Sequence, residues 1–405
     1  MFWPGVASFR DPLGTTVHQL TTTDASGGEN QTPYWHQNLA VDDDRILIVN
    51  LAKAGAEYTV LNVRTGARSL AAARGTANGE SVRNGAMYGF HYAESKAWLG
   101  RLDLETLVWE HFVLRSPSST FKGGVAVNIA ENRIVWLERN GGEKLGVRVR
   151  AFDRERRQVS TLYEGPDDLQ HMVFSPVDPD LFFYINQSAG LSIRRLGLGR
   201  VEARRMQPIS AAGEYWTKRF NLADPFWGHE GGLMSDVIWH PDDPPGSYAL
   251  VRFDVSRDAG AAFAEIAPAQ QTRWLLPVVW RNQHVNPTRF PGWFVGDGDP
   301  QGFFSGRRFV SLVYIPPLGG VVRVYPLASH RGPLPHQNAV PNTHALPGGD
   351  ALVTTWRYDA ASGRESAANV YLIEVPPHLR RAMVSGRPAD EQEGIPLQFP
   401  ETLRQ

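Results

Sequence analysis

The sequence predicts an all-β fold, a single-domain β-propeller of seven blades that spans residues 1–405. Helical periodicity is nearly absent, and strand-forming segments dominate. A polar turn followed by an apolar run recurs about seven times at intervals of roughly 40–65 residues, which is the length of a four-stranded propeller blade. No Pro-, Gly- or Ser-rich linker divides the chain, which disfavours the alternative of two β-sandwich domains.

The seven turn-and-strand signals follow one another along the chain. They are DDDRILIVN at Asp43, ESKAWLGRL at Ser95, ENRIVWLER at Asn132, DPDLFFYI at Asp178, DDPPGSYALVRF at Asp243, FPGWFVG at Pro291 and PGGDALVTTW at Gly348. Hairpin turns in LNVRTGARSL, RLDLETLVWEH, AFDRERRQVSTL and IPPLGGVVRVYPL are typical of the outer strands of such blades. The one helix that we expect is short and lies in PHLRRAMVSG.

The two ends of the chain are expected to share one blade. The N-terminal segment TTVHQLT has no inner strands of its own, and the C-terminal segment NVYLIEV lacks an outer partner. Pairing of these two strands would close the ring and remove the open sheet edges that otherwise invite aggregation.

Composition excludes several classes of function. The formal net charge is −1 and 20% of residues are charged, so no basic field indicates nucleic-acid binding. The chain has no cysteine, which excludes disulfides, thiolate metal sites and cysteine nucleophiles. It has no apolar run long enough to span a membrane and no visible signal peptide. The lack of a visible signal peptide favours the cytoplasm, whereas the sequons at Asn30 and Asn186 point weakly towards export, so the compartment stays open. Composition does not indicate an oligomeric state.

Polar side chains recur about seven positions before most of the turns. The positions are His36, Tyr88 with His91 nearby, His171, Asp236, His284, and Pro341, which lies between Gln337 and His344; only the turn at Asn132 leads back to an apolar residue, Val125. In a propeller, residues just ahead of the innermost strand lie at the rim of one face, where ligands commonly bind. We therefore expect these side chains to share one pocket, although each could instead bond to the backbone of a neighbouring blade.

Aromatic residues in the loops between the expected blades suit a sugar ligand, because Trp and Tyr stack on pyranose faces. The candidates are Tyr34, Trp35, Tyr215, Trp216 and Trp227. Packing between blades is the alternative for each of them.

Several segments together resemble one family. They are DPLGTTVHQLT, PYWHQNLAVDDDRILIV, RLDLETL, QHMVFSPVDPD, HVNPTRFPGWFVGDGD, HQNAVPNTHALPGGDALVTT and NVYLIEVP. In order and spacing they resemble the oligogalacturonate lyases, polysaccharide lyases with a seven-bladed propeller. The resemblance implies cleavage at C4 of a uronic acid by β-elimination. It also implies a manganese ion held by three His and one Gln, a His base and an assisting Arg.

The family pattern transfers only in part. His284 and Gln337 fall on metal ligands, whereas Val340 and Asn342 stand where the family has its other two metal His; His344 follows two residues later. The resemblance places Arg194 on the assisting Arg, His171 on a pocket His and Asp236 on the catalytic His. The last departure leaves His171, His229 or Tyr88 as other candidates for the base. The metal ligands that the resemblance implies are His284, Gln337 and Asn342. Such a site would bind calcium or manganese, or the protein would use no metal at all.

These residues predict a divergent lyase that acts on a uronate-containing oligosaccharide or polysaccharide, galacturonate or glucuronate, for example one ending in rhamnosyl-glucuronate. The residues expected to bind the substrate are Tyr34, Trp35, His36, His91, Tyr215, Trp216 and His344. Two alternatives stay open. One is a non-catalytic carbohydrate-binding propeller. The other is a glycoside hydrolase, which would need Asp236 paired with Glu230 or Glu214.

Overall fold

The fold is described by a computed structural model. It describes residues 1–23, 28–33, 38–114, 119–140, 146–165, 169–186, 190–196, 201–204, 226–237, 248–253, 272–276, 284–296, 309–316, 322–329, 331 and 342–389. Within these residues the chain is all-β: its strands form antiparallel sheets, and α3 (Pro377–Ser385) is the one helix. The chain divides into two compact units. Unit 1 is 1–75, 240–249 and 274–405, and unit 2 is 76–239 and 250–273.

Three sheets belong to unit 1. The first has the order β1-β2-β29-β28-β27, from β1 (Ala7–Arg10), β2 (Thr16–Gln19), β29 (Arg364–Glu374), β28 (Ala351–Asp359) and β27 (His344–Ala345). The second is β3 (Glu29–Gln31), β4 (Arg45–Ala52), β5 (Gly55–Asn62) and β6 (Arg68–Ala72). The third is β23 (Val285–Pro287), β24 (Trp293–Gly296), β25 (Phe309–Tyr314) and β26 (Arg323–Ser329).

Three sheets lie in unit 2, each with four strands in chain order. They are β7 (Ala77–Arg83), β8 (Ala86–Ala93), β9 (Lys96–Asp103) and β10 (Trp109–Leu114); β11 (Ser119–Val127), β12 (Arg133–Asn140), β13 (Val147–Asp153) and β14 (Gln158–Gly165); and β15 (Leu169–Phe174), β16 (Leu181–Asn186), β17 (Gly190–Leu196) and β18 (Val201–Arg204). A further sheet contains β19 (Phe226–Trp227), β20 (Leu233–Val237), β21 (Tyr248–Phe253) and β22 (Thr272–Leu276).

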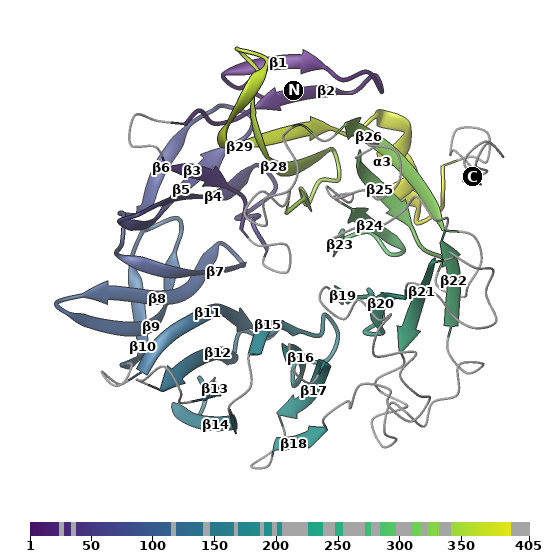
Figure 1. The fold of residues 1–405 in the computed structure, drawn as a ribbon. Helices are drawn as coiled ribbons and strands as arrows, with labels where there is room; N and C mark the ends of the chain where they lie inside the picture. Colours follow the sequence, from purple (N-terminus) through teal and green to yellow (C-terminus); the bar gives the residue numbers. More distant parts are fainter. Residues whose placement is uncertain are drawn as a thin grey trace. The chain divides into compact units, whose positions relative to one another are not determined.

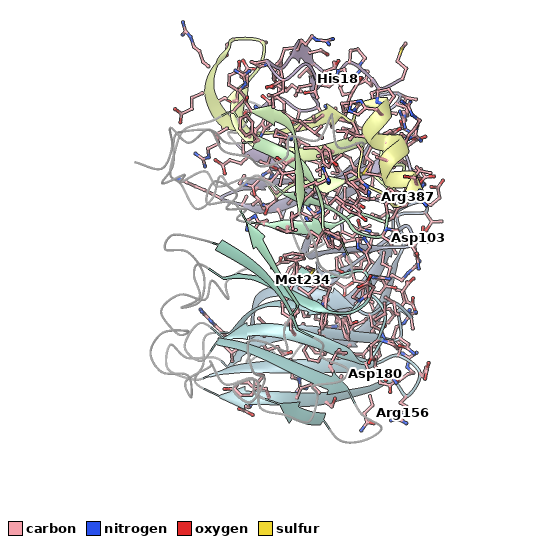
Figure 2. The ribbon with its side chains drawn as sticks, turned by 90° about the vertical axis from the view of Figure 1, so that its right-hand side faces the viewer. His18, Asp103, Arg156, Asp180, Met234 and Arg387 are labelled. Carbon is pink, nitrogen blue, oxygen red and sulfur yellow. The ribbon has the colours of Figure 1, made fainter. Side chains whose placement is uncertain are left out.

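The predicted pairing of the two chain ends is present. β2 pairs antiparallel with β29, with Val17 opposite Ile373, so N-terminal and C-terminal strands share one sheet (Figure 1). His18, labelled in Figure 2, lies on β2, and its Nε2 is 2.9 Å from Glu374 Oε1 on β29. The other ring nitrogen, Nδ1, is 2.9 Å from Ser8 Oγ on β1. One imidazole therefore contacts both neighbouring strands.

Apolar side chains fill the space between successive sheets within each unit. In unit 1 the largest cluster surrounds Trp293 and Trp356, with Leu379 and Met383 of α3 packed against it. In unit 2 Phe90 and Trp136 belong to one cluster between the sheets that begin with β7 and β11. Burial of both faces explains why the second strands are continuous apolar runs rather than alternating ones.

The apolar runs predicted from the sequence do not all occupy the same position in the strand order of their sheets. Five of them are second strands, but ESKAWLGRL forms β9 and DDPPGSYALVRF leads into β21, which are third strands. The offset of about seven residues therefore does not lead to the same place in every sheet. Tyr88 and Asp236 lie in the second strands β8 and β20, so the predicted common position is wrong for these two candidates. The β7–β8 hairpin was not predicted, because its turn consists only of Asn84 and Gly85. Both residues have positive φ values, 45° and 73°, as a tight two-residue turn requires.

Substitution of Gly5 tests the packing of the sheet in which the N-terminal and C-terminal strands pair. Its φ is +71°, and a Cβ there would lie 2.1 Å from the carbonyl oxygen of Gln19 on β2. Gly14 has a similar φ of +88° but nothing nearer than Arg10 Nη2 at 3.9 Å. We expect Gly14→Ala to cost about 1 kcal/mol from backbone strain alone. Gly5→Ala should cost about 3 kcal/mol, because the backbone clash adds to the same strain. Urea unfolding of both variants measures the difference, and equal losses would contradict the clash.

Candidate functional site

The candidate site in unit 1 lies where β23 and β27 begin. His284 directly precedes β23, and Asn342 and Thr343 directly precede His344, the first residue of β27. Asn286 Nδ2 donates a 2.7 Å hydrogen bond to the Thr343 carbonyl, so the two strand starts are held together. Both histidines are buried, with 3% of His284 and 6% of His344 exposed.

His344 has a fixed orientation and protonation. Its Nε2 is 3.0 Å from the Pro33 carbonyl oxygen, which can only accept, so Nε2 carries the proton. In the neutral ring Nδ1 is then the nitrogen with the lone pair. Burial and, to a smaller degree, nearby His284 lower the pKa of His344 to about 4, although the bond to Pro33 opposes this. A neutral imidazole that donates its other N–H to a carbonyl is the usual arrangement of a metal-ligating histidine.

The lowered pKa of His344 predicts a pH dependence of stability. The unfolded ring binds a proton near its ordinary value of 6.5, whereas the folded ring does so only near about 4. Between these values the unfolded state binds more protons, so stability must fall as the pH drops from about 6.5 to about 4, by up to about 3 kcal/mol. Urea unfolding at several pH values measures this. His344→Gln should lack this component, and an identical pH slope in the variant would contradict the assignment.

Asn342 occupies its position for a backbone reason. Its φ is 44°, in the left-handed region that Asn tolerates better than most residues. Its carbonyl oxygen accepts a 2.8 Å hydrogen bond from Thr32 Oγ1, and the backbone N–H of Thr32 donates to Thr355 Oγ1 at 2.9 Å. Thr32 therefore ties this segment to β28. The sequence reasoning missed Thr32, whose only signal is a polar residue next to a buried strand.

The donor set at this position fits a divalent cation of the manganese-to-zinc series. Two buried imidazoles lie close together, and the ring of His344 is neutral at physiological pH. Of the other two expected ligands, Gln337 lies outside the described residues, and Asn342 is buried two residues before His344. In the described part of the chain, no group of three or more His, Cys, Asp or Glu side chains is arranged to hold a metal ion.

Tyr88 is held in a structural contact of unit 2. It is fully buried on β8, and its hydroxyl donates to Glu131 in the turn between β11 and β12. Glu131 has a positive φ of 54° and also accepts a hydrogen bond from Asn84 Nδ2. Burial and the bond to Glu131 raise the pKa of Tyr88 above its ordinary value. Tyr88 is thus poorly suited to carry a proton at neutral pH.

Two other candidates lie near the β19–β20 turn. His229 is half-buried in this turn, and the adjacent Glu230 is exposed. Trp227 is 3% exposed, donates from Nε1 to the Val173 carbonyl at 3.1 Å, and packs against Phe183. Trp227 is thus part of the core and not a surface for stacking a sugar.

The remaining candidates are placed only in part. Tyr34, Trp35, His36, Glu214, Tyr215, Trp216 and Gln337 lie outside the described residues. The backbones of His171, Arg194 and Asp236 lie in β15, β17 and β20, but their side chains are outside what the structure describes. His91 lies on β8 with its ring stacked on Trp109.

Asn30 bears on the question of compartment. It is 8% exposed, and its Nδ2 donates to the Thr22 carbonyl at 3.0 Å. Its side chain is therefore not accessible to glycosylation in the folded protein. No helix in the described part of the chain combines the length and apolar character that a membrane crossing requires.

The sequence matches no protein-family model and no curated protein. Among solved structures, an oligogalacturonate lyase in complex with manganese has a TM-score of 0.67 at 14% identity, over 93% of this chain and 96% of that one. An oligogalacturonate lyase from Vibrio parahaemolyticus also has a TM-score of 0.67, at 15% identity, over 91% of this chain and 96% of that one. The chain therefore shares its fold with oligogalacturonate lyases, which confirms at the level of fold the resemblance seen in its sequence.

Proposed function

We propose that this chain is a lyase that cleaves a uronate-containing oligosaccharide or polysaccharide by β-elimination at C4 of the uronic acid. The observation that supports it most is the buried pair of His284 and His344, with His344 neutral and held by Pro33, in a chain with the lyase fold. We also propose that the sheets are the seven blades of one propeller, closed where β2 pairs with β29. The cytoplasm is the proposed compartment.

The reaction sets three chemical requirements. The uronate carboxylate must be neutralised so that the C5 proton becomes acidic, a base must remove that proton, and the leaving oxygen at C4 must be protonated. His284 and His344 would hold a divalent cation, with Gln337 as a further ligand. When bound, such a cation supplies the positive charge that stabilises the carboxylate as negative charge develops on it.

The chain's own residues would handle the proton. From the family resemblance we assign proton removal at C5 to the carboxylate of Asp236 and charge stabilisation to Arg194. A carboxylate is a weaker base than an imidazole at neutral pH, so Asp236 must have a raised pKa in the complex. His171 is the other candidate base. Tyr88 is excluded from this assignment because its hydroxyl is committed to Glu131.

The test is an ultraviolet absorbance assay, since elimination creates a conjugated double bond that hydrolysis does not. The purified protein is incubated with galacturonate and glucuronate oligosaccharides, first with chelator and then with added Mn²⁺ or Ca²⁺. We expect absorbance to rise only after metal is restored. If absorbance also rises in the presence of the chelator, neutralisation of the uronate carboxylate is assigned to Arg194 instead of a cation. Intact substrate across the whole panel would contradict the proposal, and calorimetry with the same sugars would then test a binding function.

A further inference from the structure

A cluster of four rings lies on one face of the sheet β7-β8-β9-β10. It consists of His91 on β8, Trp98 on β9, and Trp109 and His111 on β10. His91 lies directly opposite Trp98 in the ladder. His111 lies opposite Gly100, two residues further along β9. Because side chains two residues apart point to the same face, all four rings share that face.

The two imidazoles of this cluster are in direct contact. His91 Nδ1 lies 2.8 Å from His111 Nε2, and the ring planes differ by 19°. Trp109 stacks on His91 with ring centroids 4.8 Å apart and a plane angle of 6°. Trp98 stacks on His111 with centroids 5.3 Å apart and a plane angle of 19°. His111 is exposed and the other three rings are half-buried, so the pair is open to solvent.

Gly100 makes this contact across β9 possible. It lies between Gly89 on β8 and His111 on β10. A Cβ at position 100 would be 2.6 Å from the Glu110 carbonyl oxygen and 3.2 Å from the Trp109 ring. Without side chains at Gly89 and Gly100, the rings from two strands that are not neighbours can meet above the strand between them.

The spacing of the two nitrogens matches adjacent ligands of a metal ion. With metal–nitrogen bonds of about 2.0 Å, ligands at a right angle lie about 2.8 Å apart, whereas tetrahedral ligands lie about 3.3 Å apart. Right-angled nitrogen and oxygen coordination is typical of Cu²⁺ and Ni²⁺, which also bind imidazole well. A sugar platform is less favoured, because one face of each imidazole is already stacked on a Trp ring.

We propose that His91 and His111 form a surface site for a divalent ion of the copper and nickel type, with their facing nitrogens as adjacent ligands and water in the remaining positions. The metal-free pair shares one N–H, which one imidazole donates to the other. On binding, that proton moves through water to the far nitrogen of the same ring. The two rings then turn so that their lone pairs, which point at each other in the hydrogen-bonded pair, converge on the ion. Both rings stay neutral, and no electron is transferred.

The experiment titrates the full-length, chelator-treated protein with Cu²⁺ and, separately, Ni²⁺. Binding is followed by calorimetry and by tryptophan fluorescence, which Cu²⁺ quenches when it binds beside Trp98 and Trp109. We expect His91→Ala and His111→Ala each to weaken one binding event by about tenfold or more. His111 is exposed, so its substitution should leave the fold intact, which circular dichroism verifies.

Two controls separate this site from others. His378→Ala, on the exposed face of α3, should leave the titration unchanged. His284→Ala should keep the same binding event, because that residue belongs to the lyase site. Cu²⁺ spectra of the wild type should show two coordinating nitrogens, and those of His111→Ala should not. Equal affinity and identical spectra for wild type and His111→Ala would overturn the proposal.

Discussion

Replacing His344 with Ala is expected to lower the rate of elimination by about a hundredfold or more, the usual cost of losing a group that binds a catalytic metal or moves a proton. The imidazole is buried, neutral and aimed by the Pro33 carbonyl, so no solvent molecule can take its place with the same orientation. The ultraviolet absorbance assay at saturating substrate measures the effect on kcat.

His344→Gln is the matched variant for this prediction. The Gln amide can still donate to the Pro33 carbonyl, but it lacks the imidazole nitrogen that would face a ligand. We expect it to keep the stability of the wild type near neutral pH and to remain as inactive as the Ala variant. If His344→Gln restored activity, His344 would only position the backbone, and its role in the chemistry would be refuted.

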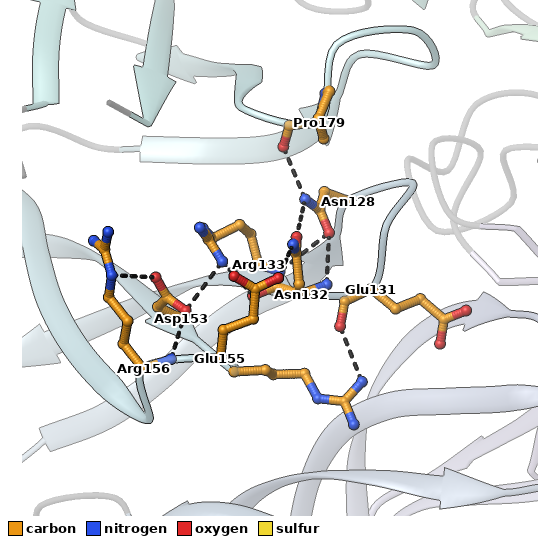
Figure 3. A network of polar contacts seen from close by, with 9 residues as sticks. Asn128, Glu131, Asn132, Arg133, Asp153, Glu155, Arg156 and Pro179 are labelled. Carbon is orange, nitrogen blue, oxygen red and sulfur yellow. Dashed lines mark hydrogen bonds and ion pairs between the residues drawn. The ribbon is translucent and has the colours of Figure 1, made fainter. Parts of the chain in front are cut away.

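Replacing Asn128 with Ala is expected to cost about 3 kcal/mol of stability. Asn128 is fully buried after β11, and its Oδ1 accepts hydrogen bonds from the backbone N–H groups of Asn132 and Arg133 (Figure 3). Its Nδ2 donates to the Pro179 carbonyl at 2.9 Å, which connects this turn to the next sheet. Ala would leave these groups without partners, and urea unfolding measures the loss.

Asn128→Asp separates the two halves of this network. A carboxylate can still accept from the two N–H groups, but it cannot donate to Pro179 and would face its carbonyl oxygen with a negative charge. We expect a loss of stability that is smaller than for Ala and that grows as the pH rises through the pKa of the new carboxyl. A loss below about 0.5 kcal/mol for Asn128→Ala would show that water replaces the side chain.

The fold could be predicted from the sequence largely because most of the sheets repeat the same local pattern. Turn residues followed by β-branched and aromatic runs predicted β4, β12, β16, β24 and β28. The helix in PHLRRAMVSG and the pairing of the two chain ends were also predicted correctly. The β7–β8 hairpin was missed because Asn84-Gly85 lacks the longer polar turn that marks the other strands, although Asn-Gly is itself a strong hairpin signal.

The candidate site was less predictable, because long-range pairing decides the role of each polar residue. The sequence put His284 and His344 close to the same site, but the tautomer of His344 is set by the Pro33 carbonyl, which lies far away in the chain. In the sequence, Tyr88 stands about seven positions before a turn, as the candidate histidines do. Its partner Glu131, 43 residues further along, converts it into a structural donor. Neither partner follows from local spacing.

The most direct test of the central claim is the mass of the cleavage products formed from a uronate oligosaccharide in water enriched in heavy oxygen. Elimination breaks the bond without adding water, so we predict an unsaturated product that contains no label, formed by the wild type and absent with His344→Ala. Incorporation of one heavy oxygen for each bond cleaved, with a saturated product, would show hydrolysis and would contradict the account.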